Sequence, residues 1–221
     1  MANVLVIGAS GGIGTALVLA CRARGDQVTG LSRSDDGLDL TDEASVERVL
    51  GGVVGPFDLI LVATGGLEIA GAVPEKSIKA LSQKAMMDQF ALNAVGPALV
   101  LRYAAGLLQR KGRARIAVLS ARVGSIGDNQ LGGWISYRSA KAALNQIVHT
   151  AAIELRRSHP ESSCVALHPG TVATSLTETY MGHHPTVLAP EAAANLLCVI
   201  DALTPADTGQ FFDWAGKVVP W

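Results

Sequence analysis

The chain has little net charge with which to attract a charged partner. Its 221 residues include 18 lysines and arginines and 19 acidic residues, which leaves a formal net charge of −1. Binding to nucleic acid or to an anionic membrane surface relies on an excess of basic residues. We therefore expect neither nucleic acid nor a membrane among the partners of this protein.

Cysteine is scarce and is not arranged in pairs. The three cysteines, Cys21, Cys164 and Cys198, lie far apart in the sequence, and their number is odd. This distribution is typical of reduced cysteines in a cytoplasmic protein rather than of a disulfide framework. None of them has neighbours at the spacing of metal ligands, so we also expect no metal site.

Charged side chains are missing from residues 1–21, as they would be in a signal or membrane-spanning segment. The stretch has no basic start, however, and polar residues and four glycines interrupt it. We interpret it as part of the fold. The chain also lacks internal repeats and low-complexity linkers. The sequence therefore predicts one domain over residues 1–221, with 49% hydrophobic residues to fill its core.

Apolar runs alternate with longer helical patterns along the whole sequence. The predicted strands are residues 4–7, 27–31, 59–63, 115–119, 163–168 and 209–212. The predicted helices are residues 15–24, 43–51, 84–109, 137–157 and 190–203. Apolar strands joined by helical crossovers predict an α/β fold, a doubly wound Rossmann-type parallel sheet with helices on both faces.

A glycine-rich turn separates the first predicted strand from the first predicted helix. It reads Gly8-Ala9-Ser10-Gly11-Gly12-Ile13-Gly14. In this context the glycines let the backbone approach a pyrophosphate, and the helix start offers unpaired N–H groups to it. The spacing is G-x-x-x-G-x-G, not the G-x-G-x-x-G of the longer dehydrogenases. The alternative is a turn that only connects strand to helix.

Tyr137 and Lys141 form a Tyr-x-x-x-Lys pair within a predicted helix. Residues four apart lie on one face of a helix, so the two side chains are within reach of each other. A nearby ammonium favours the phenolate, so we expect Lys141 to lower the pKa of Tyr137 and make it a usable acid or base. Taken alone, the pair could also arise by chance on a helix of this length.

Together, the two motifs resemble the short-chain dehydrogenase/reductase family, and its small C-factor-like members in particular. Further matches follow in the family's order: Asp39-Leu40-Thr41, Val62-Ala63-Thr64-Gly65, Asn93 and Pro169-Gly170-Thr171-Val172-Ala173-Thr174. The resemblance implies hydride transfer between a nicotinamide dinucleotide and a carbonyl or alcohol. It places the cofactor against Gly8, Ser10, Gly11, Gly12, Ile13, Gly14, Ser32, Arg33, Asp39, Leu40, Ala63, Thr64, Gly65, Tyr137, Lys141, Pro169, Gly170, Val172 and Thr174.

The residues after the second predicted strand bear on the choice of cofactor. NAD-specific enzymes tend to place an acidic residue there to hold the ribose 2′-hydroxyl, but this sequence has Ser32 followed by Arg33. An arginine can bind a 2′-phosphate through charge-assisted hydrogen bonds, which favours NADP(H) over NAD(H). Asp35 and Asp36 could weaken this preference, and Arg33 could also be a solvated loop cation.

The resemblance also assigns catalytic roles. Tyr137 exchanges a proton with the substrate oxygen, Lys141 holds the ribose and lowers the pKa of the tyrosine, and Asn93 positions a water. The family's catalytic serine falls on Ala121. Ser125 could replace it, and Ser120 less readily, because an extended strand would turn Ser120 away from the site. A protein that binds a dinucleotide for signalling, with weak or no turnover, is therefore the alternative function.

The substrate is expected to be a small carbonyl or alcohol of unspecified structure. We expect the walls of the substrate pocket to include Trp134, Met181, His183 and His184. The segment 173–188 would form a lid over the substrate. The family also implies a homodimer or homotetramer.

Overall fold

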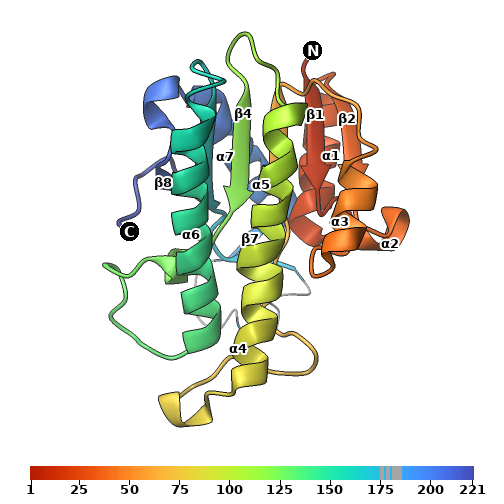
Figure 1. Cartoon of the computed structure of the whole chain (residues 1–221). Coiled ribbons are helices and arrows are strands. Elements are labelled where there is room, and N and C mark those ends of the chain that lie inside the picture. The colour runs from red at the N-terminus through yellow and green to blue at the C-terminus, as the bar shows by residue number, and fades with distance from the viewer. Residues whose placement is uncertain (175–176, 178–179, 181–185) are drawn as a thin grey trace.

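The computed structural model describes residues 1–174, 177, 180 and 186–221. Its centre is a parallel sheet of six strands in the order β2-β1-β3-β4-β5-β8 (Figure 1). The strands are β1 (Asn3–Ile7), β2 (Gln27–Leu31), β3 (Leu59–Val62), β4 (Arg115–Leu119), β5 (Ser163–His168) and β8 (Phe211–Asp213). The predicted doubly wound α/β fold is confirmed.

Helices cover both faces of the sheet. One face carries α3 (Glu43–Leu50), α5 (Gly96–Leu107) and α6 (Ile135–Leu155), and the other carries α1 (Gly12–Ala23) and α7 (Ala189–Ala202) (Figure 1). Alternate strand residues fill the two cores: Leu5 and Ile7 of β1 pack under α3 and α5, whereas Val4 and Val6 pack under α1 and α7. Burial on both faces explains why the strands are continuous apolar runs.

The long helix predicted over residues 84–109 is interrupted. The structure has α4 (Gln83–Phe90), one π-helical turn (Ala91–Val95) and then α5. Pro97 lacks an N–H group, so it cannot donate the regular helical hydrogen bond to the carbonyl of Asn93. The run Gln83–Leu107 is long and apolar enough for a membrane-spanning helix, but Val100 and Leu101 of α5 are buried in the core.

Several element boundaries differ from the predictions. The helix α6 begins two residues earlier than predicted, β3 ends at Val62, and β8 covers Phe211–Asp213 because Gly209 forms a turn at φ 82°. The structure also contains elements that are too short to give a periodic signal. They are α2 (Arg33–Asp36) and a separate parallel pair of β6 (Val172–Ala173) and β7 (Val187–Leu188).

The strand order determines where a ligand can bind. The chain moves from β1 to β2 at one side and then crosses to β3 at the other, so the order reverses between β1 and β3. In open parallel sheets a crevice forms at this reversal, outside the carboxyl ends of the strands. The glycine turn after β1 and the segment after β3 lie at this crevice.

Candidate active site

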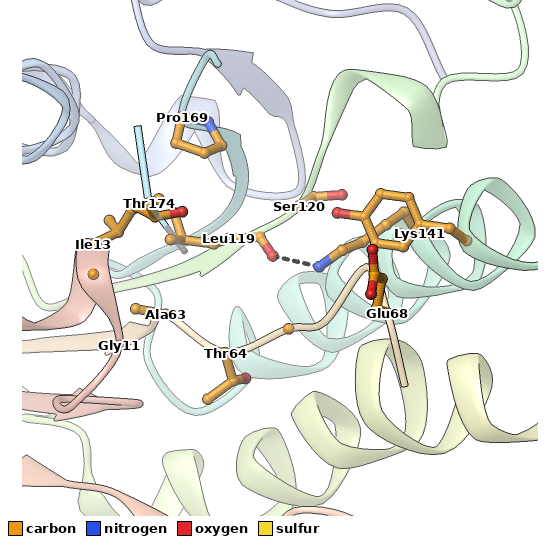
Figure 2. A pocket seen from close by; sticks show the side chains of 13 residues that line it. Gly11, Ile13, Ala63, Thr64, Glu68, Leu119, Ser120, Lys141, Pro169 and Thr174 are labelled. Carbon is orange, nitrogen blue, oxygen red and sulfur yellow. Dashed lines mark hydrogen bonds between the residues drawn. The ribbon is translucent and has the colours of Figure 1, made fainter. Parts of the chain in front are cut away.

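A cavity of about 510 Å³ opens at the carboxyl ends of β1, β3 and β4. Figure 2 shows its lining from the glycine turn at one end to the Lys141 side chain at the other. The residues that line it are Gly11, Gly12, Ile13, Ala63, Thr64, Gly65, Glu68, Leu119, Ser120, Tyr137, Lys141, Pro169 and Thr174. The structure thus brings the two principal sequence motifs to one cavity.

The glycine turn is packed too closely for larger residues. Gly8 has φ 88°, and a Cβ on Gly14 would lie 2.0 Å from the carbonyl oxygen of Gly8. A Cβ on Gly12 would meet Thr174 Cγ2 at 2.6 Å. The helix α1 then begins after Gly11 without a side-chain cap, so its first N–H groups stay available to an anion at the cavity.

The segment after β3 forms the next part of the wall. The hydroxyl oxygen of Thr64 is buried and has no hydrogen-bond partner within the described structure. A buried hydroxyl usually finds a partner, so a ligand in this cavity would supply one. Gly65 has φ 153°, and a Cβ there would come within 2.9 Å of Asn93 Oδ1. The cavity's glycine turn, open helix start and unpaired hydroxyl fit a dinucleotide.

Tyr137 and Lys141 lie one turn apart on α6, as predicted. Lys141 Nζ is 5.9 Å from the centre of the Tyr137 ring and donates a hydrogen bond to the carbonyl of Leu119 over 3.1 Å. Burial raises the pKa of Tyr137 to about 12 and lowers the pKa of Lys141 to about 8. The expected lowering of the tyrosine pKa is therefore wrong for this structure, because burial disfavours the charged forms of both groups.

Asn93 lies in the π-helical turn and is fully buried. Its Oδ1 accepts from Gly66 N over 3.0 Å, and its Nδ2 donates to Gly66 O over 2.8 Å and to Gln89 Oε1 over 2.7 Å. The side chain thus clamps the segment after β3 against α4. It is not among the described residues that line the cavity, and it contacts the cavity wall through the segment after β3. Its role in positioning a water stays a prediction.

The structure places Ser120, rather than Ser125, on the cavity. The strand β4 ends at Leu119, so strand alternation does not apply to Ser120, and the prediction that Ser120 faces away from the site is wrong. Ser120 Oγ donates to Asn145 Oδ1 over 2.6 Å. Ser125 is buried, and its Oγ accepts from Asp128 N over 3.1 Å, which fixes the following loop.

The remaining predicted cofactor residues are not among the residues that line this cavity. The Ser32 hydroxyl caps α2 by accepting from Asp35 N, and Arg33 is exposed beside it. The others are Gly8, Ser10, Gly14, Asp39, Leu40, Gly170 and Val172. Of the expected pocket walls, Met181, His183 and His184 lie outside the described residues, as does much of the expected lid.

Sequence reasoning missed two residues at the site. Glu68 lines the cavity, and Asn145 holds Ser120 while its Nδ2 donates to the carbonyl of Gly124 over 3.4 Å. Asn145 lies four residues after Lys141 on the same helix, which is a signal that the sequence did contain. Glu68 lies in an irregular segment whose path the sequence does not reveal.

Comparison with known proteins identifies the family. A model of the short chain dehydrogenases matches residues 37–183. The protein belongs to this family. As a short-chain dehydrogenase it is an oxidoreductase by homology, and its family acts on small molecules. The prediction drawn from the two motifs is therefore confirmed at the level of the family.

Curated relatives of this short-chain dehydrogenase include a dehydrogenase and a protein named C-signal. It is 32% identical over 233 residues to 1-hydroxy-2-glutathionyl-2-methyl-3-butene dehydrogenase of Rhodococcus sp. strain AD45, with 100% of both chains covered. It is 39% identical over 137 residues to the C-signal protein of Myxococcus xanthus, covering 62% of this chain and 78% of the relative.

Solved structures show the same fold. The NADPH-bound carbonyl reductase from chicken fatty liver has a TM-score of 0.82 at 24% identity, with 99% of this chain and 94% of that one covered. The carbonyl reductase Sniffer of D. melanogaster has a TM-score of 0.80 at 21% identity, with both chains covered completely.

Proposed function

We propose that this short-chain dehydrogenase is an NADP(H)-dependent oxidoreductase that interconverts a carbonyl and an alcohol, with Tyr137 as the acid/base. The observation that carries the proposal is the shared cavity: the open start of α1 and the Tyr137–Lys141 pair line the same space. An anion-binding helix start and a proton donor in one cavity suit a dinucleotide and a carbonyl side by side.

The position of each residue in the cavity suggests its role. Gly12 and Ile13 would bind the pyrophosphate, and Pro169 and Thr174 would bound the nicotinamide, which when bound supplies or accepts the hydride. Tyr137 gives its proton to the carbonyl oxygen in reduction or takes one from the alcohol in oxidation. With a pKa of about 12, the phenol is protonated at neutral pH, as a proton donor must be.

Lys141 supports the proton transfer as a cation whose position is fixed by a hydrogen bond. With a pKa of about 8, its ammonium is mostly charged at neutral pH, and the Leu119 carbonyl fixes its direction. A positive charge close to the phenol stabilises the phenolate that proton donation leaves behind.

The proposed preference for NADP(H) is supported by the surroundings of Ser32. Asp36 Oδ2 accepts from Ser32 N over 2.7 Å, and Asp35 Oδ2 accepts from Ser32 Oγ over 3.0 Å. Both carboxylates are thus engaged in holding the start of α2. Arg33 is exposed and forms no ion pair among the described residues, so its guanidinium is available to a 2′-phosphate.

The proposal is tested by following NADPH consumption with a panel of ketones and aldehydes. We expect turnover of at least one of them, and we expect Tyr137→Phe to lower kcat by about 100-fold or more while NADPH still binds, because only the proton donor is removed. Equal turnover by both proteins would contradict the role of Tyr137.

A second function is favoured by Ala121 and by the similarity to the C-signal protein. If the missing serine has removed useful turnover, the protein would bind a dinucleotide and act as a redox-responsive signalling module. NADPH binding without turnover of any carbonyl or alcohol would support this function over the first.

We also propose that the protein is cytoplasmic and forms a homodimer or homotetramer. Val95, beside the start of α5, and Ile153 on α6 are exposed apolar side chains that a subunit contact would cover. Sedimentation analysis measures the mass directly, and a monomer near 22.9 kDa would contradict the assembly.

A further inference from the structure

A carboxylate lines the cavity at the end that lies away from the glycine turn. Among the described residues of the lining, Glu68 is the acidic one. Figure 2 shows it on the Lys141 side of the cavity, apart from Gly11 and Ile13. Within the described part of the chain Glu68 forms no ion pair, so its negative charge is not neutralised by a protein cation.

Aromatic rings connect this carboxylate to the proposed proton donor. Tyr180 Oη donates to Glu68 Oε1 over 2.5 Å. The Tyr180 ring packs edge-on against Trp134 with centroids 5.5 Å apart, and Trp134 packs edge-on against Tyr137 at 6.3 Å. A carboxylate attracts an ammonium group through its negative charge, and an aromatic ring adds to this attraction where its face is turned to the cation.

Trp134 is held in a backbone conformation that residues with side chains rarely adopt. Its φ and ψ are 51° and 38°, in the left-handed region. Its N–H donates to the carbonyl of Glu75 over 2.5 Å, and the Glu75 carboxylate accepts from the N–H and the hydroxyl of Ser136 at the start of α6. Such strain persists where surrounding contacts enforce it, and it concentrates at functional sites.

Glu75 does not compete with Glu68 for a cation from the substrate. Its side chain is buried, and both of its oxygens bond to Ser136. The carboxylate that remains available at the cavity is that of Glu68, whose Oε1 accepts one hydrogen bond from Tyr180. Glu68 is exposed, and a cationic group of the substrate would complement its negative charge.

We propose that the substrate is a carbonyl compound or alcohol that carries an ammonium group, with this group bound at Glu68 and Tyr180 and the reacting oxygen at Tyr137. The inference rests on the proposed oxidoreductase function. In reduction, hydride adds to the carbonyl carbon, the electron pair of the C=O bond goes to oxygen, and oxygen takes the proton of Tyr137. The ammonium keeps all of its bonds and serves only to orient the substrate.

Two ketones of the same shape separate charge from size. Phenacyltrimethylammonium carries the cation, and in phenyl neopentyl ketone a carbon replaces the nitrogen. Binding of each to the full chain with NADP⁺ is measured by calorimetry, and kcat/KM is measured with NADPH. The proteins are the wild type, Glu68→Gln and the control Glu161→Gln. The carboxylate of Glu161 is exposed and precedes β5, so it lies at the amino ends of the strands, away from the cavity.

We expect the wild type and Glu161→Gln to bind the cationic ketone about fivefold more tightly than the neutral one, and Glu68→Gln to bind both alike. Equal binding by the wild type, failure to bind either ketone, or a preference that survives in Glu68→Gln would overturn the ammonium site. Selective binding without turnover of either ketone would instead contradict the proposed function and leave the ammonium site in place.

Discussion

At the scale of single residues, the serine hydroxyl that shares the cavity with Tyr137 is that of Ser120. Ala121 falls at the position predicted for the family's serine, whereas Ser120 lines the cavity. The single proton of Ser120 is donated to Asn145, so this hydroxyl must change partner before it can donate to a substrate oxygen. We therefore expect Ser120 to be a weaker oxyanion donor than a serine at position 121 would be.

Removal of each serine hydroxyl distinguishes the two candidate donors. We expect Ser120→Ala to lower kcat by about 100-fold, because it removes the hydroxyl on the cavity. Ser125→Ala, which removes a hydroxyl bonded to the loop at Asp128, should change kcat by less than about threefold. Steady-state kinetics with NADPH provide the measurement. A larger loss of kcat in Ser125→Ala than in Ser120→Ala would identify Ser125 as the donor.

Restoring the serine at its family position is the complementary change. We expect Ala121→Ser to raise kcat by about tenfold, since it adds a donor where the family has one. The comparison is made with a carbonyl that the wild type reduces, with Ala121→Val as a control for added volume. An unchanged kcat in Ala121→Ser would mean that the wild type already has a full donor.

Lys141 provides a residue-scale prediction about stability. Burial lowers its pKa from 10.5 to about 8, so the folded chain carries the cost of a buried charge below pH 8. Between pH 8 and pH 10.5 the unfolded chain binds more protons than the folded chain. The free energy of unfolding therefore rises with pH in this range, as the cost of the buried charge decreases. We expect Lys141→Met to increase the free energy of unfolding at pH 7 by about 1–3 kcal/mol while abolishing turnover.

Urea unfolding at two pH values checks this sign. The stabilisation by Lys141→Met should be full at pH 7 and largely lost at pH 10, where the lysine of the wild type is neutral in the fold. A loss of stability at pH 7 would show that the bond to the Leu119 carbonyl outweighs the burial of the charge.

At the scale of elements, the start of α1 depends on contact between the helix and the turn that precedes it. A Cβ on Gly14 would lie 2.0 Å from Gly8 O, a distance that backbone cannot accommodate without moving. We expect Gly14→Ala to destabilise the fold by about 3 kcal/mol and to weaken dinucleotide binding, because it displaces the glycine turn. Urea unfolding and NADPH titration measure the two effects.

Gly106 supplies the matched control within a helix. It lies in α5, and a Cβ there would meet no atom within 4 Å. Gly106→Ala should stabilise the protein by about 0.5 kcal/mol, because alanine favours the helix and restricts the unfolded chain. Similar losses of stability in Gly14→Ala and Gly106→Ala would indicate a general effect on helix formation rather than crowding at the glycine turn.

At the scale of the whole molecule, the coenzyme should stabilise the fold by mass action. A ligand that binds only the folded chain raises the melting temperature, and a tenfold difference in affinity corresponds to about 1.4 kcal/mol at saturation. We expect NADPH to raise the melting temperature by about 3 °C more than NADH at equal concentration. Arg33→Ala should remove most of this difference, and an unchanged difference would place the 2′-phosphate elsewhere.

Most of the framework could be predicted from the sequence because it depends on local patterns. The strands β2, β4 and β5 have the predicted boundaries, and Tyr137 and Lys141 share a face of α6 because four residues make about one helical turn. The interruption at Asn93 was not predicted, since the apolar pattern continues through it. Glu68 was not predicted either, because an irregular segment carries no periodicity that would place it.

The sequence by itself determined the family, the parallel sheet and the two motifs, because each depends on residues close together along the chain. Only the tertiary structure decided how these parts act on one another. It enclosed Tyr137 among distant segments and thereby raised the pKa that its neighbouring lysine was expected to lower, because desolvation depends on how such segments pack. It also put Ser120 on the cavity and brought Glu68 to Tyr180, contacts between segments that sequence spacing does not encode.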